Sequence, residues 1–138
     1  MCRVGVNMWL GDSVGRVFVY AVSTCALQWS VRLQEVVGGA PSAVAALCPL
    51  APLSRLALAL ACGRLFLVST TRPAAESSFV LTELGTATEL SCLAAASATD
   101  GVEVWAGGDH LYTYTVTEEG VSAAETLPCP APAPAAAQ

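Results

Sequence analysis

The stretch NMWLGDSVGRVFVY, residues 7–20, sets out a pattern that the chain repeats. An apolar segment with Trp9 leads through a short turn, which contains Gly11 and Gly15, into an alternation of apolar and aromatic residues. The stretch VEVWAGGDHLYTYTV, residues 102–116, has the same order. Short segments rich in Val, Leu, Thr and aromatic residues, bounded by Gly-containing turns, are typical of strands joined by hairpins.

A third copy lies between these two. GRVFVY at 15–20 aligns with GRLFLV at 63–68, which begins 48 residues later, and DHLYTY at 109–114 begins 46 residues after that. A repeat of about 40–50 residues made of four short strands is typical of a β-propeller blade. We predict strands near residues 4–10, 16–21, 27–33, 43–48, 56–61, 64–69, 78–83, 89–95, 102–106, 110–116 and 121–126. The Ala-rich runs SAVAALCPL and ATELSCLAAASA are also compatible with short helices.

The predicted fold is all-β, a partial β-propeller of about three four-stranded blades over residues 1–127. The blades cover 1–36, 37–85 and 86–127, the first is incomplete, and 128–138 form a Pro/Ala-rich flexible tail. An ordinary β-sandwich whose segments resemble each other by accident is the alternative. The positions expected to shape each blade are Trp9, Gly11, Gly15, Phe18, Tyr20, Gly63, Phe66, Trp105, Gly107, Asp109, Tyr112 and Tyr114.

Packing between blades explains why the pattern recurs. In RVFVY, Val17 and Val19 lie on one side of the strand and Phe18 and Tyr20 on the other, so both faces are apolar. This predicts a strand covered by a neighbouring blade on each face. QWSVRLQE alternates apolar and polar residues, as an outermost strand would, and the small residues of AVAAL and CLAAA suit an innermost strand.

Three blades are fewer than the four to eight that close a propeller ring. The array would therefore leave open blade edges and exposed apolar faces. We expect the chain to be a fragment of a larger propeller or to associate with itself through these open edges.

The segments MWLGDSVGRVFVY and VEVWAGGDHLYTYTV resemble blades of the divergent WD-repeat type. Their residue pattern is similar to that of blades in the C-terminal propellers of JNK-interacting-protein scaffolds and of Rho guanine-nucleotide exchange factor 10-type proteins. The similarity to the propellers of leucine-rich-repeat kinases is weaker. The resemblance implies a cytoplasmic signalling or trafficking scaffold, or the regulatory region of an exchange factor. The chain has no Gly-His dipeptide and no terminal Trp-Asp, so the His/Asp arrangement of standard WD repeats is not carried over.

Composition limits the other classes of function. The six basic residues are all Arg and stand singly along a chain of net charge −5, which argues against nucleic-acid binding. The longest uncharged stretch, residues 36–54, contains three prolines, so we expect no membrane span. Six cysteines show no C-x-x-C pairing and lie mostly in apolar runs, which favours reduced thiols, a cytoplasmic location and no zinc site.

No set of residues has the spacing of a catalytic site. Asp109 and His110 are adjacent at a hairpin turn and would point to opposite faces of a strand, which does not suit a hydrolase triad. The carboxylate pairs Glu118–Glu119 and Glu83–Glu89 lie at turns or on polar strands, where solvated charge explains them. Trp29, on a predicted outer strand, could either anchor a partner or pack against the next blade.

The sequence therefore predicts a non-catalytic protein-interaction module without a cofactor, which displays loops near 34–43, 70–77 and 96–101 to other proteins. A self-contained β-sandwich that binds a ligand is the main alternative, and a propeller-based hydrolase is a further one.

Overall fold

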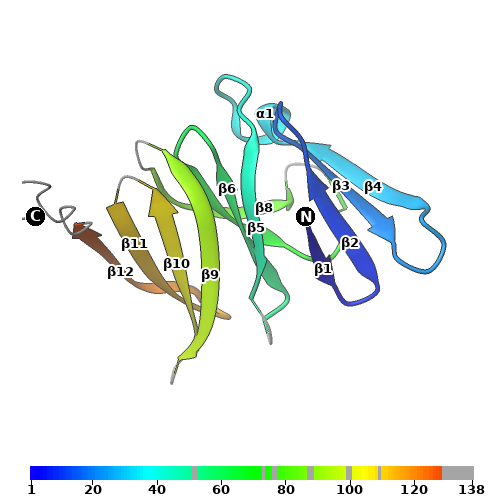
Figure 1. Ribbon diagram of the computed structural model, residues 1–138. Helices are drawn as coiled ribbons and strands as arrows, with labels where there is room; N and C mark the ends of the chain where they lie inside the picture. The colour runs from blue at the N-terminus through cyan, green and yellow to red at the C-terminus, as the bar shows by residue number, and fades with distance from the viewer. Residues whose placement is uncertain are drawn as a thin grey trace, which may run out of the picture.

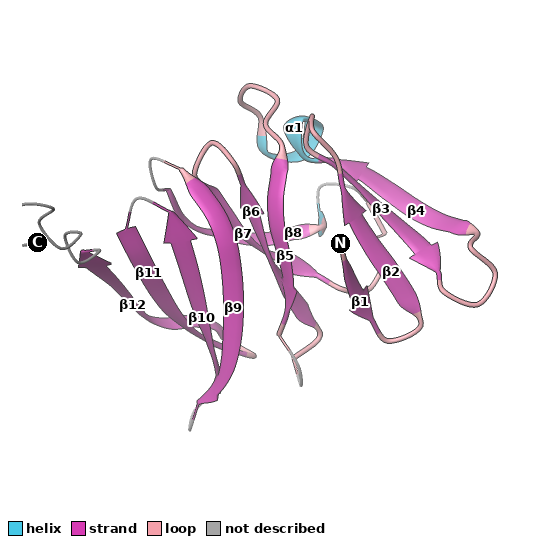
Figure 2. Ribbon diagram, viewed as in Figure 1, coloured by secondary structure: helices cyan, strands magenta, loops and turns pink. Residues whose placement is uncertain are grey.

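The computed structural model describes residues 1–50, 53–72, 74–75, 78–86, 89–98, 101–108 and 110–128. These residues form three antiparallel four-stranded sheets, which stand side by side and do not close into a ring (Figure 1). Strands dominate the described chain, and the short helix lies beside the first and middle sheets (Figure 2). This confirms the prediction of an all-β fold with three blade-like units, and it differs from the two packed sheets of a β-sandwich.

Each sheet is built from four strands in chain order, so that each strand pairs with the next along the sequence. The first sheet holds β1 (Cys2–Val4), β2 (Asn7–Gly11), β3 (Arg16–Ala21) and β4 (Leu27–Arg32). The middle sheet holds β5 (Val44–Pro49), β6 (Arg55–Leu60), β7 (Arg64–Ser69) and β8 (Val80–Thr86). The third sheet holds β9 (Leu90–Ala98), β10 (Gly101–Gly108), β11 (His110–Thr117) and β12 (Gly120–Pro128). Helix α1 (Leu33–Val37) follows β4.

The first sheet corrects one prediction. The expected strand at 4–10 is two strands, β1 and β2, joined by a turn at Gly5, whose φ is +57°. The first sheet is therefore complete, with Cys2 opposite Trp9 in the β1–β2 register. Its innermost strand carries Arg3, so small uncharged residues do not line all three inner strands.

Other boundaries also differ from the sequence pattern. Residues 33–37, expected at the end of a strand and in a loop, form helix α1, and the Ala-rich runs are strands β5 and β9 rather than helices. The loop expected at 96–101 lies largely in strands, since β9 extends to Ala98 and β10 begins at Gly101. Pro128 ends β12, and residues 129–138 of the predicted tail lie outside the described residues.

The innermost strands of the three sheets lie next to one another. β5 contacts β9 on one side and both β1 and β2 on the other. Figure 1 shows β1, β5 and β9 at neighbouring edges of the sheets, from which the remaining strands extend outwards. Inner strands that meet in this way, with antiparallel strands ordered outward, are the arrangement of neighbouring propeller blades.

The core consists of two layers, one on each face of the middle sheet. Leu56, Leu58 and Leu60 of β6 belong to the cluster shared with the first sheet, and the alternating residues Ala57 and Ala59 belong to the cluster shared with the third. Strand β7 divides in the same way between these two clusters. The period-2 alternation of a strand thus lets one sheet bury both faces. The sequence predicted this double covering for RVFVY, which is β3 of the first sheet; there the structure covers only the face of Val17 and Val19.

Candidate interaction surfaces

The aromatic residues of the first sheet form the centre of the first core layer. The Trp9 side chain is fully buried; its ring lies 5.2 Å from that of Trp29 in an edge-on contact and 6.0 Å from that of Phe79 in a stacked one. Trp29 also meets Phe79 at 5.6 Å. Packing against the middle sheet therefore accounts for Trp29, which was a candidate partner anchor. Phe79, which the sequence did not single out, comes from the segment before β8.

The glycines of the repeat have two different roles. Gly15 has a φ of +86° in the β2–β3 turn, and Gly63 has a φ of +103° in the β6–β7 turn. Gly11 and Gly107 have no positive φ; a Cβ at Gly11 would lie 2.4 Å from Val44, and one at Gly107 would lie 2.7 Å from the Sγ atom of Cys92. Gly107 is therefore a strand residue in close contact with β9, just before the hairpin that leads from β10 to β11.

Equivalent aromatic positions meet different surroundings in the three sheets. Phe66 is fully buried against the first sheet, and Tyr114 is buried and Tyr112 partly buried against the middle sheet. Phe18 and Tyr20 are only half-buried, because the face of the first sheet on which they lie has no neighbouring sheet. Trp105 is likewise exposed on the far face of the third sheet. Asp109 lies outside the described residues.

An apolar pocket of about 360 Å³ opens on this uncovered face of the first sheet. It is lined by Met8, Leu10, Tyr20, Ala21, Val22 and Cys25. In the strand register Met8 lies opposite Tyr20, and Leu10 lies opposite Phe18, so the lining belongs to one continuous sheet face. Its lining is mostly apolar and offers few polar groups to orient a small molecule.

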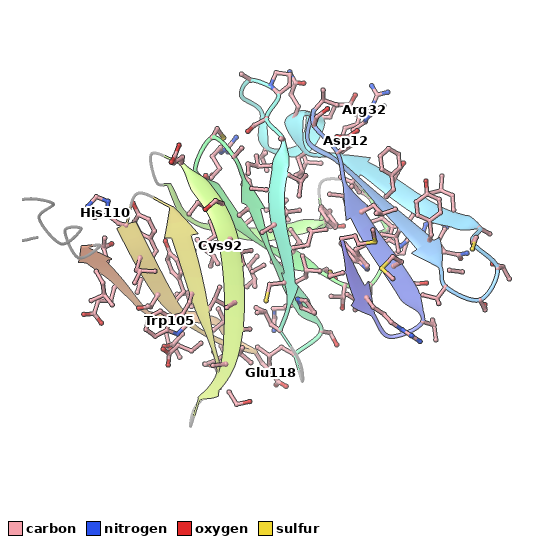
Figure 3. All side chains as sticks on the ribbon, in the orientation of Figure 1. Asp12, Arg32, Cys92, Trp105, His110 and Glu118 are labelled. Carbon is pink, nitrogen blue, oxygen red and sulfur yellow. The ribbon has the colours of Figure 1, made fainter. Side chains whose placement is uncertain are left out.

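A second, polar pocket of about 320 Å³ lies where the β2–β3 turn approaches α1 and the following loop. It is lined by Val14, Arg16, Arg32, Gln34, Glu35 and Pro41, and we call it the arginine groove. Residues 34–43 were predicted to be a display loop, and Gln34, Glu35 and Pro41 come from that segment. Figure 3 shows Asp12 and Arg32 at this edge of the molecule.

Intramolecular carboxylates hold both guanidinium groups of the arginine groove. Arg16 pairs with Asp12, whose carboxylate also accepts hydrogen bonds from the backbone N–H groups of Val14 and Arg16. Arg32 lies 3.6 Å from Glu35. Desolvation raises the pKa of Asp12, but the hydrogen bonds from Arg16 and Val14 outweigh it and hold that pKa below its usual value. Each guanidinium group of the groove thus lies beside a carboxylate of its own chain.

The candidate catalytic residues are dispersed. His110 is exposed at the start of β11. Glu83, which the sequence placed near Glu89, instead forms a two-point ion pair with Arg64 at 3.0 Å. Glu118 lies in the β11–β12 turn, and its backbone carbonyl accepts a hydrogen bond from Arg55.

Within the described residues, no polar or charged residue is buried and no cluster of three or more His, Cys, Asp or Glu could hold a metal ion. The five described cysteines are free thiols. No helix in the described part of the chain is long and apolar enough to cross a membrane.

No protein-family model and no curated protein sequence matches this chain.

Proposed function

We propose that this protein is a non-catalytic protein-interaction module that presents the arginine groove on a rigid stack of three sheets. The observation that carries the proposal is the pairing of two exposed guanidinium groups, at Arg16 and Arg32, with the apolar side chains of Val14 and Pro41 in one concavity. Arginine is enriched where proteins meet, because its planar fork of donors binds carboxylates in a defined orientation.

The chemistry of the groove favours a partner segment with a carboxylate beside an apolar residue. The side chains of Arg32 and Glu35 are 64% and 57% exposed, so their ion pair is weak and can yield to an incoming acid. Arg16 is held more firmly, since Asp12 accepts hydrogen bonds from both its side chain and its backbone. We infer that Arg16 fixes the position of the groove and that Arg32 makes the exchangeable contact.

The likeness to WD-type blades supports a place in a cytoplasmic scaffold or in the regulatory region of an exchange factor. The free thiols of the described cysteines suit a reducing compartment. A hydrolase or lactonase built on a propeller would need clustered acidic or metal-binding residues, and no charged residue is buried in the described sheets. We therefore propose rigid display rather than catalysis.

A random-peptide library selected on the immobilised protein tests this function. We expect enriched peptides to contain Asp or Glu next to an apolar residue. Their affinity, measured by fluorescence anisotropy, should fall about tenfold in Arg32→Ala, because a charge-assisted hydrogen bond is lost. Arg72→Ala, an exposed arginine outside the groove, is the matched control. Enrichment of no peptide, or equal effects of the two variants, would refute the proposal.

A further inference from the structure

The repeat makes the outer face of the first sheet complementary to the outer face of the third sheet. In β3, Val17 and Val19 face the middle sheet, and their equivalents in β7, Leu65 and Leu67, face the third sheet. We call this the forward face of each sheet and its opposite the backward face. The forward face of the third sheet and the backward face of the first sheet are the two faces that the described chain leaves uncovered.

Trp105 on the open forward face has a buried counterpart. Trp9 lies opposite Val19 in its sheet, and Trp105 lies opposite Thr113, which the repeat offsets of 48 and 46 residues make equivalent to Val19. Trp9 is fully buried beneath the middle sheet, whereas Trp105 is 36% exposed. Trp105 therefore has the same position in the repeat as Trp9, but no sheet of the described chain covers it.

The open backward face has the composition of a surface that receives such a tryptophan. In the middle sheet Leu58 lies opposite Phe66 and Leu56 opposite Val68, and all four are buried in the cluster that holds Trp9. The equivalent residues of the first sheet are Leu10, Phe18, Met8 and Tyr20, and all of them except Phe18 line the apolar pocket. Arg16 lies over Phe18 as Arg64 lies over Phe66, at 5.5 and 4.9 Å from the ring centres.

The segments that form the first and third sheets carry opposite formal charges. Residues 1–37, which include the first sheet, hold three arginines and two carboxylates, whereas residues 89–128, which include the third sheet, hold seven carboxylates and neither Arg nor Lys. The formal charges of these two segments are therefore +1 and −7. Figure 3 shows Arg32 and Trp105 on opposite sides of the molecule, so attraction acts between copies rather than within one.

The registers place these charges on the open faces themselves. Arg3 lies opposite Met8, and Arg16 opposite Arg32, on the backward face of the first sheet, with Asp12 and Glu35 beside the latter two. Glu103 precedes Trp105 by two residues, and Glu125 lies opposite Thr113 on the forward face of the third sheet.

We infer that two copies of this chain assemble head to tail into a closed six-bladed propeller, in which the forward face of each third sheet covers the backward face of the other copy's first sheet. Propeller rings close with four to eight blades, and six is the one multiple of three in that range. Closure by a two-fold axis buries both open faces of each copy in two identical contacts. Arg16 and Arg32 of the arginine groove lie on the backward face that this closure covers, so the assembled ring and a groove-bound peptide compete for one surface.

Light scattering coupled to size-exclusion chromatography tests this assembly on the intact chain. The expected mass is about 28 kDa, twice the 14.1 kDa of one chain. Trp105→Ala removes a tryptophan from both contacts of the ring, so at about 30-fold for each central interface tryptophan the dimer dissociation constant should rise about 1,000-fold. Leu10→Glu should act similarly by placing a carboxylate against the acidic third sheet. Leu81→Glu is the matched control, because Leu81 is 47% exposed on the outermost strand β8, away from both open faces.

Mixing the two damaged variants identifies the head-to-tail geometry. The intact forward face of Leu10→Glu can still bind the intact backward face of Trp105→Ala, so monomers of each should form a heterodimer with one contact. If the forward face instead bound a second forward face, or the backward face a second backward face, mixing the two variants would not restore a dimer in this way. That result would overturn the inference. So would a folded wild-type chain that stays at 14.1 kDa at all concentrations, a result that leaves the peptide-binding proposal standing.

Discussion

Replacement of Trp9 by alanine tests the packing of the first sheet on the middle one. The side chain is fully buried and its ring contacts both Trp29 and Phe79. Its removal leaves a cavity between two sheets that share this one core layer. We expect a large loss of stability with the strands retained.

The magnitude follows from the buried area. A buried aromatic side chain covers roughly 150–250 Å², which at about 25 cal/mol per Å² corresponds to roughly 4–6 kcal/mol. Alanine keeps the Cβ atom and the neighbours partly collapse, so we expect a loss of about 3–5 kcal/mol. Trp9→Phe should lose less than half of this, because it keeps a ring against Phe79 and removes an indole N–H that has no acceptor among the described residues.

Urea unfolding followed by circular dichroism, at one protein concentration for all variants, gives the free energy of unfolding. Leu81→Ala is the exposed control and should change the free energy by less than about 0.5 kcal/mol. If Trp9→Ala loses no more than Leu81→Ala, or if Trp9→Phe is as damaging as Trp9→Ala, the assignment of Trp9 to the centre of this layer is wrong.

Three further predictions concern polar contacts and the backbone. Glu83→Gln should cost about 0.5–1 kcal/mol at pH 7, because its pair with Arg64 is partly exposed, and thermal melts should show the difference from wild type vanishing under acid. The pKa values of Glu83 and Asp12 are lowered in the folded chain, and for Glu83 the hydrogen bond from Arg64 is the main cause. The stability that these two carboxylates contribute should therefore be complete above the usual carboxylate pKa and fall as the pH drops through the lowered values. A melting temperature that rises on acidification would contradict this. Gly15→Ala should destabilise by about 1–2 kcal/mol, since φ is +86° and the new Cβ would lie 2.9 Å from a backbone oxygen, whereas Gly5→Ala meets no atom within 4 Å and should cost less in the same melts.

The repeat made the number of sheets predictable from the sequence alone. The offsets of 48 and 46 residues between GRVFVY, GRLFLV and DHLYTY fixed three units, and the turns at Gly15 and Gly63 lie where the pattern placed them. Local composition did not reveal the turn at Gly5 and Val6, because CRVGVNMWL reads as one apolar strand with a single glycine. It also hid helix α1, since five residues are too few to show a helical period.

Burial depends on neighbours in space, which the sequence pattern does not contain. Phe18 and Tyr20 carry the apolar character of a covered face, yet they are half-exposed because no sheet of the described chain covers that face. The arginine groove was likewise unpredictable: Arg16 and Arg32 stand sixteen residues apart and meet because β3 and β4 pair in antiparallel register. Phe79 could have been found, since it is the one aromatic residue in its predicted strand.

The middle sheet shows how the repeat can vary at the tryptophan position. Ala57 is the equivalent of Trp9 there, as it lies opposite Leu67. The third sheet fills the space that a tryptophan would take with Tyr114, which is buried between the sheets; burial raises the pKa of its phenol. Gly85 makes room for the hydroxyl, because a Cβ at Gly85 would lie 2.7 Å from the Oη atom of Tyr114. Large and small side chains are thus matched across each contact rather than fixed within each sheet.

This matching constrains what can cover Trp105. A sheet placed over a tryptophan on a forward face has to offer leucine-type side chains and space, as Leu56, Leu58 and their neighbours do over Trp9. The first sheet offers Met8 and Leu10 at the positions of Leu56 and Leu58 but carries Tyr20 where the middle sheet has Val68, so a covered Trp105 would lie beside Tyr20 in the apolar pocket.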